Sequence, residues 1–171
     1  MPEIALALFV LCAASCAQRG PDIAQHTIAA APATIRVELD DAARDALTRR
    51  LSARSLDVAR VILHDVHPIG RELKGVRIFI EKPDADLKTP TDDPHYAGSF
   101  VPGFAPPETI NLNIAPTLAR VWAAGELTRA SLSDRKAIRV TLVPEPWEPA
   151  VRLSPEFSMT IHSITLDVPK Q

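Results

Sequence analysis

The sequence predicts a mainly β protein, an antiparallel β-sandwich of about seven strands with one or two short helices. Three observations favour this fold class. Short apolar runs, several of them alternating apolar with polar residues, recur along the chain as half-buried strands do. The 16 prolines, set against only 6 glycines, separate these runs at intervals too short for a helix bundle. Hydrophobic residues make up 46% of the chain but aromatic residues only 5%, so the predicted core is mostly aliphatic.

The first 17 residues are predicted to be a signal peptide or a lipoprotein signal. Residues 4–17 are almost wholly apolar, and this run is too short to span a bilayer but suits the apolar region of a signal. Ala13-Ala14-Ser15-Cys16 resembles a bacterial lipobox, so Cys16 is the candidate for lipidation. An ordinary signal peptide that happens to contain a cysteine is the alternative. We therefore expect an exported protein, either periplasmic or lipid-anchored to a bacterial membrane.

A tether is predicted over residues 18–33, followed by a single β-sandwich domain over residues 34–171. The tether carries little periodic pattern. The domain opens with residues 34–39, which alternate strictly between polar and apolar side chains as a half-buried strand does. Two aspartates then offer N-caps for a helix near residues 41–53, in which apolar side chains recur at helical spacing.

The rest of the domain is predicted to hold the remaining strands and a second short helix. Residues 83–95 carry several charged side chains and three prolines, which indicates a loop. Pro116 starts the second helix at a position where proline is favoured, and Gly125 ends it. Pro144 is predicted to stop the strand before it. The remaining strands are predicted at residues 58–66, 76–80, 96–101, 109–114, 136–143 and 157–168.

Four short segments, in order, resemble motifs of one protein family. Residues 96–101 read Tyr-Ala-Gly-Ser-Phe-Val, against the family's Ala-Gly-Ser-Phe-Val, and residues 140–144 read Val-Thr-Leu-Val-Pro, as a strand of the family does. Residues 75–81 stand in the place of the signature Lys-Phe-Asp-Val-Tyr-Val-Asn and match its apolar alternation but not its letters, and residues 61–66 precede them. The family is the C-terminal domain of polyphenol oxidases, the tyrosinase-related type-3 copper enzymes. The similar region is residues 57–168.

The resemblance implies a β-sandwich that packs over the copper site of a tyrosinase domain. In latent members of the family this domain shields the site, a side chain from it can plug the entrance, and it performs no chemistry itself. The tyrosinase domain has no counterpart in this sequence, so the resemblance implies a separate tyrosinase-type copper oxidase as the partner. The strand and helix predicted over residues 34–53 have no match in the family's domain.

The histidines argue against oxidase chemistry by this chain. A type-3 copper pair needs six imidazoles, whereas the sequence has five histidines and none of them form a helical i, i+4 pair. His64 and His67 lie three apart in a predicted strand and should face opposite sides unless a bulge intervenes. His95, beside Asp92 and Asp93, offers a weak divalent-ion site, although a solvated acidic loop is the favoured interpretation. No catalytic residue, cofactor or metal site is therefore predicted.

Other function classes are also disfavoured. The formal net charge is −2 with charges of both signs intermixed, so no basic stripe predicts a nucleic-acid partner. Ser99 and Ser131 lack the flanking glycines of a nucleophile elbow, and neither predicts a hydrolase. Contact with a membrane is expected only through a lipid on Cys16.

Two proline-rich loops, residues 102–107 and 144–149, are the candidates for binding a partner. Each holds one large aromatic side chain between prolines, Phe104 in the first and Trp147 in the second. Proline fixes φ and so reduces the entropy lost on binding, while a buried aromatic side chain contributes strongly to an interface. Phe104 follows the best-matching motif and is the first candidate for a plug. A loop residue folded back over the edge of the sandwich is the alternative interpretation for Trp147.

The sequence thus predicts a non-catalytic accessory or shielding domain associated with a tyrosinase-type copper oxidase. The alternative is a freestanding periplasmic structural or ligand-binding β-sandwich unrelated to oxidase activity. No cofactor is expected in this chain under either hypothesis.

Overall fold

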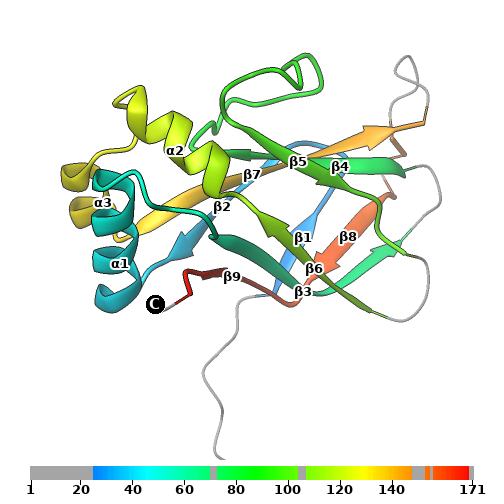
Figure 1. Ribbon diagram of the computed structural model, residues 1–171. Helices are drawn as coiled ribbons and strands as arrows, with labels where there is room; N and C mark the ends of the chain where they lie inside the picture. Colours follow the sequence, from blue (N-terminus) through cyan, green and yellow to red (C-terminus); the bar gives the residue numbers. More distant parts are fainter. Residues whose placement is uncertain (1–24, 70–72, 104–106, 148–152, 155, 170–171) are drawn as a thin grey trace, which may run out of the picture.

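Strands from distant parts of the chain pair in two antiparallel sheets that face each other (Figure 1). The computed structural model describes residues 25–69, 73–103, 107–147, 153–154 and 156–169. Its described residues form nine strands and three short helices, which confirms the predicted mainly β antiparallel sandwich. The four-stranded sheet has the order β2 (Ala33–Glu38), β7 (Ala137–Pro146), β4 (Leu73–Ile80), β5 (Tyr96–Phe100). The five-stranded sheet has the order β1 (His26–Ile28), β8 (Ser158–Ile161), β3 (Arg60–Ile69), β6 (Glu108–Asn113), with β9 (Ser163–Asp167) also paired to β3.

Aliphatic side chains fill the space between the two sheets. Alternate residues of β7, Ile138, Val140 and Leu142, are fully buried. Val61 and Leu63 of β3 are buried in the same cluster from the opposite sheet. The period of two along each strand places these side chains on one face, which is why the alternation in the sequence predicts the core correctly.

The loop after β4, residues 81–95, covers part of the outer face of the four-stranded sheet. Arg77 of β4 is buried, and its Nη1 and Nη2 donate hydrogen bonds to the backbone oxygens of Thr89 and Leu87 at 2.7 and 2.8 Å. Arg77, the one charged residue within the apolar run of residues 76–80, therefore holds the loop against the sheet. A small second cluster of buried side chains is made by Phe79, Ala85 and Val143.

Asp86 shapes this covering loop from within. Its Oδ1 accepts hydrogen bonds from the backbone N–H groups of Lys88 and Thr89 at 2.8 and 3.0 Å. The bond from the Lys88 backbone holds the pKa of Asp86 below its ordinary value; desolvation opposes this shift, and the bonds from Thr89 support it. The loop is thus ordered by local hydrogen bonds as well as by Arg77.

The helices gather at one end of the sandwich (Figure 1). Helix α1 (Asp41–Ser52) starts where the sequence predicts, because the side chain of Asp40 accepts the N–H of Ala43 at 2.6 Å. Helix α2 (Ala115–Ala123) has Pro116 in its first turn and is followed by Gly125, whose φ of +78° suits a residue without a side chain. No helix of the described residues combines the length and the hydropathy needed to cross a membrane.

A third helix, α3 (Arg129–Arg135), was not predicted. Thr128 and Ser131 form its capping box: the Thr128 hydroxyl accepts the Ser131 N–H at 3.1 Å, and the Ser131 hydroxyl accepts the Thr128 N–H at 2.9 Å. The helix buries a single side chain, Leu132, so it has too few apolar positions for a periodic signal.

Strand β7 continues through Pro144 to Pro146, so the prediction that Pro144 ends the strand is wrong. The neighbouring strand β2 begins opposite Leu142, at residue Ala33. Beyond that point one side of β7 has no β2 residue to pair with, and a proline, which has no N–H to donate, is tolerated at such an edge. On its other side β7 still pairs with β4, with Val76 opposite Pro144.

The predicted strand over residues 157–168 is divided into β8 and β9, which pair with successive parts of β3. The division faces a bulge in β3, where the pairing with β6 shifts between Leu63 and Val66. Asp65 within it has a φ of +50°, a left-handed conformation that aspartate tolerates better than most residues. The N–H of His162, the residue between β8 and β9, donates to the backbone oxygen of His64 at 3.0 Å and so joins that residue to β3 at the bulge.

The predicted tether over residues 18–33 contains a strand. His26–Ile28 forms β1 and pairs with β8, and Ile28 is 1% exposed. Three residues are too few to show a periodic pattern in the sequence. The strand forms by pairing with β8, and its sequence alone does not predict it. The part of the tether before residue 25 and the predicted signal segment with Cys16 lie outside the described residues.

Candidate functional site

Strands β5 and β7 end on the side of the four-stranded sheet that lies away from the helices (Figure 1), and an exposed apolar residue follows each of them. Val101, directly after β5, and Trp147, directly after β7, are each 64% exposed. Phe100 and Pro144 both pair with Val76 of the intervening strand β4, so β5 and β7 leave the sheet at the same end, Val101 one residue beyond that level and Trp147 three residues beyond it. Two strand spacings separate β5 from β7, or about 10 Å. These two residues are referred to below as the apolar tip.

Gly75 allows β5 to approach β4 closely beside Val101. A Cβ atom at Gly75 would lie 3.0 Å from the backbone oxygen of Phe100 and 3.8 Å from Cγ2 of Val101. The first distance is shorter than a comfortable contact, and backbone cannot move aside cheaply. The glycine therefore fixes where the chain carrying Val101 leaves the sheet.

The structure places the predicted partner-binding residue Trp147 in the open. Its exposed fraction of 64% shows that the indole does not fold back over the edge of the sandwich, which was the alternative interpretation. Its role in binding a partner stays a prediction. The other predicted residue, Phe104, lies outside the described residues, as does the lipidation candidate Cys16.

His64 and His67 face the same side of β3, contrary to the simple prediction. Val61 and Leu63 point inward before the bulge at Asp65, and Val66 points inward after it. The bulge adds one residue to β3, which shifts the inward and outward alternation of the side chains by one position after Asp65. His64 and His67 therefore both point outward. The Nε2 of His64 lies 3.1 Å from the hydroxyl of Thr165 on β9.

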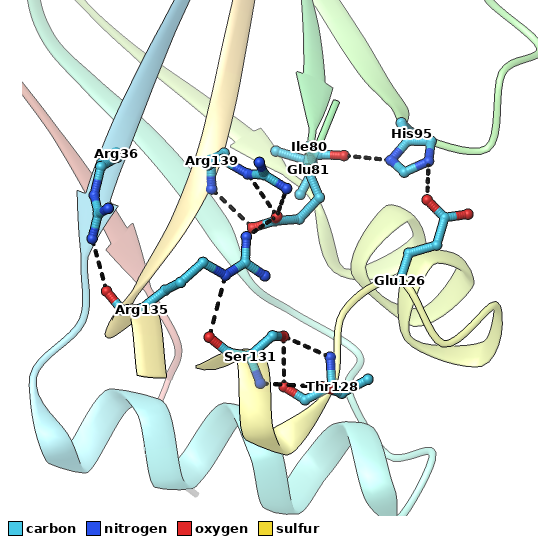
Figure 2. A network of polar contacts seen from close by, with 9 residues as sticks. All are labelled: Arg36, Ile80, Glu81, His95, Glu126, Thr128, Ser131, Arg135 and Arg139. Carbon is cyan, nitrogen blue, oxygen red and sulfur yellow. Dashed lines mark hydrogen bonds and ion pairs between the residues drawn. The ribbon is translucent and has the colours of Figure 1, made fainter. Parts of the chain in front are cut away.

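His95 is buried and points away from the acidic pair beside it in the sequence. Its Nδ1 lies 2.7 Å from the backbone oxygen of Ile80, and its Nε2 lies 2.8 Å from Oε2 of Glu126 (Figure 2). Both ring nitrogens of His95 are therefore engaged by neighbouring oxygen atoms. Asp93 instead accepts the backbone N–H of His95 at 2.9 Å. Within the described ranges, no three His, Cys, Asp or Glu side chains are grouped as metal ligands would be.

A buried charge lies directly after β4, in the side chain of Glu81. This side chain is 1% exposed, and the residue has a φ of +58°. Its Oε2 lies 2.6 Å from Nη1 of Arg135 and 2.9 Å from Nη2 of Arg139, and its Oε1 accepts the backbone N–H of Arg139 at 2.9 Å (Figure 2). The two guanidinium groups supply the hydrogen bonds that a buried carboxylate requires.

This cluster joins parts of the chain that are far apart in sequence. Arg135 ends α3, Arg139 belongs to β7, and the Nη2 of Arg36 on β2 donates to the backbone oxygen of Arg135 at 2.9 Å (Figure 2). Both Glu81 oxygens bind these donors and the side chain is 1% exposed, so a substrate has no access to the carboxylate. We assign Glu81, Arg135 and Arg139 a structural role, and they are called the Glu81 cluster below.

The sequence analysis did not identify this cluster. The available signal was weak: Arg139 is a charge inside an apolar strand, and Glu81 follows an apolar strand directly. Ser131, which was considered as a nucleophile, has its hydroxyl engaged by both the N–H and the backbone oxygen of Thr128 at 2.9 Å. Ser99 is exposed on β5.

No protein-family model matches the sequence, and no curated protein matches it significantly. Among solved structures, the chain is similar to recombinant latent aurone synthase, a polyphenol oxidase, co-crystallized with hexatungstotellurate(VI): the identity is 18%, the TM-score is 0.51, and the match covers 85% of this chain and 26% of that one. Latent apple tyrosinase is 15% identical, with a TM-score of 0.48 and coverage of 84% of this chain and 27% of that one. The chain spans about a quarter of the length of these structures. The aurone synthase match shows a shared fold, consistent with the C-terminal domain that the sequence motifs resemble.

Replacement of Glu81 by glutamine should destabilise the protein by about 1–3 kcal/mol, because it removes the charge that both arginines bind while nearly keeping the shape of the side chain. Denaturant unfolding followed by circular dichroism measures the difference. Glu38→Gln is the matched control, since Glu38 is 68% exposed and pairs only with the exposed Arg36. We expect that control to cost about 0.5 kcal/mol or less. Equal losses of unfolding free energy in the Glu81 and Glu38 variants would contradict the structural role of the Glu81 cluster.

Proposed function

We propose that this chain is a non-catalytic accessory domain that docks on a separate tyrosinase-type copper oxidase and shields its copper site. The observation that carries the proposal is the apolar tip, presented at one end of a sandwich that shares its fold with part of a polyphenol oxidase. An exposed Trp and an exposed Val at the same end of one sheet have no role in the core of the domain. It is the kind of surface that a partner protein buries.

The backbone that carries Trp147 is held in place. Pro144 and Pro146 lie within β7 and still pair with β4, opposite Val76 and Leu73. Proline fixes its own φ, and strand pairing fixes the direction of the chain, so little conformational entropy is lost when the indole is buried. A tryptophan buries about 150–250 Å² in an interface, which makes it an effective anchor at this position.

The side chains of this chain supply no redox chemistry under the proposal. A type-3 copper pair needs six imidazoles, the sequence has five histidines, and the ring of one of them, His95, is engaged by Ile80 and Glu126. The copper and the oxidation of phenols would therefore belong to the partner. Phe104, in the loop after β5, remains the proposed plug at the entrance to the partner's site.

A freestanding ligand-binding sandwich is the second candidate function. One observation favours it: a hollow of about 690 Å³ lies between α1 and α2, with Leu51, Leu56 and Trp122 among its lining residues. This hollow has the size of a small-molecule site. It lies at the helical end of the molecule, away from the apolar tip, so variants at the two places separate the two functions.

The proposal places the domain outside the cytoplasm, through the apolar segment over residues 4–17. Mass spectrometry of the mature protein from its native cells should find an N-terminus created by processing, either beginning at a lipidated Cys16 or cleaved without a lipid. Replacement of Cys16 by serine should release the protein from the membrane fraction if the lipid is present. Full-length, unprocessed protein in the cytosol would contradict the proposed export.

Trp147→Ala should weaken the complex with the oxidase by about tenfold or more, because truncation of a central interface aromatic costs about 2 kcal/mol or more in binding. The full chain serves as bait in an extract of its native cells, and we expect a type-3 copper protein among the captured proteins. The captured oxidase is then expressed, and its dissociation constant is measured by titration calorimetry. Thermal unfolding of the variant should match that of the parent, because the indole is exposed.

Leu87→Ala is the matched control for this experiment. Leu87 is also an exposed apolar side chain, at 47%, but it lies on the loop that covers the outer face of the sheet. Its replacement should leave the affinity unchanged. If the Trp147 variant binds as tightly as the parent, or if the Leu87 control loses as much affinity, the docking surface is not the apolar tip.

A further inference from the structure

A hollow lined with arginines lies between α1 and α3, at the end of the molecule opposite the apolar tip (Figure 1). Its volume is about 260 Å³. No contact described above uses it: the Glu81 cluster and His95 lie outside its lining. The lining residues are Arg44, Asp45, Thr48, Arg49, Arg129 and Ser133.

Helix geometry explains why these side chains meet. On α1 the lining residues form two pairs at i, i+4 spacing, Arg44 with Thr48 and Asp45 with Arg49, which places them on one strip of the helix surface. On α3 the single lining pair has the same spacing. Two facing strips of this kind enclose a hollow with guanidinium and hydroxyl groups on both sides.

The positive charge of the hollow is not balanced by its surroundings. Arg49 and Arg129 form no ion pair with any residue that the structure describes. Arg44 is paired with Asp41, at 2.8 Å between Nη2 and Oδ1. The hollow thus has three guanidinium groups and two carboxylates, those of Asp41 and Asp45, so its net charge is +1.

A buried donor also lacks an acceptor here. The Nη1 atom of Arg44 is buried and has no hydrogen-bond partner among the described residues. A buried guanidinium nitrogen without an acceptor is costly, and a ligand oxygen would satisfy it once the Arg44 side chain turns this nitrogen toward the hollow. The donor and the excess positive charge therefore indicate the same kind of ligand.

We propose that this hollow binds a tetrahedral oxyanion, a phosphate group in free or esterified form. Guanidinium groups offer paired N–H donors that match two oxygens of such an anion. The hydroxyls of Thr48 and Ser133 can donate to further oxygens. Asp45 is the one acidic residue in the lining, and its charge opposes the anion and limits the affinity.

Titration of the full chain with inorganic phosphate at constant ionic strength tests the proposal. We expect saturable binding with a dissociation constant below about 1 mM, and movement of the Thr48 and Ser133 amide signals in nuclear magnetic resonance spectra. Arg49→Gln and Arg129→Gln should each weaken binding by about three- to tenfold, and both residues are exposed enough for the fold to persist. Asp45→Asn should tighten binding, which a purely structural role for Asp45 would not produce.

Arg60→Gln is the matched control, because Arg60 lies on β3 outside the hollow and contacts Asp167 at 3.4 Å. It should leave phosphate binding unchanged. A second titration with glycerol phosphate distinguishes the sources: binding of both compounds indicates the phosphoryl group of a larger molecule, and binding of inorganic phosphate alone indicates the free anion. Absence of saturable phosphate binding, or a loss in the Arg60 variant equal to that in the Arg49 variant, would overturn the proposal.

Discussion

The helical end of this sandwich depends on one buried carboxylate. Glu81 directly follows β4 in a left-handed conformation, which is unfavourable for a residue with a side chain, and it lies where water cannot solvate its charge. Arg135 and Arg139 compensate for both costs, because their hydrogen bonds hold the carboxylate and join α3 to β7. The covering loop starts at Glu81, and α3 forms one wall of the arginine-lined hollow, so both depend on this contact for their position.

Strand β7 separates the two ends of the molecule. Its ten residues begin at the Glu81 cluster and end next to Trp147, and an extended strand of that length spans about 33 Å. The charged end and the apolar tip therefore present independent surfaces with opposite chemistry. This separation fits an accessory domain, in which one end docks on a partner while the other end stabilises the fold and remains open to solvent.

Most of the strands and the first two helices could be predicted because their signals are local. Alternation identified β2 and the core residues of β7, and Asp40 identified the start of α1. Two errors concern pairing between distant residues: Pro144 stays in its strand because β2 begins beside it, and residues 157–168 divide where β3 bulges. For the site, Trp147 was identified from neighbouring prolines, whereas the Glu81 cluster joins residues up to 58 positions apart and leaves no local pattern.

Under the proposed function, the domain acts by covering the copper site of another protein. The rate of diphenol oxidation by the captured oxidase, measured while the purified domain is added, tests this claim most directly. The rate should fall toward zero as the domain reaches a stoichiometric amount, and Trp147→Ala should require about tenfold more protein for the same effect. An oxidation rate unchanged by a saturating amount of bound domain, or diphenol oxidation by the purified domain alone with added copper, would contradict it.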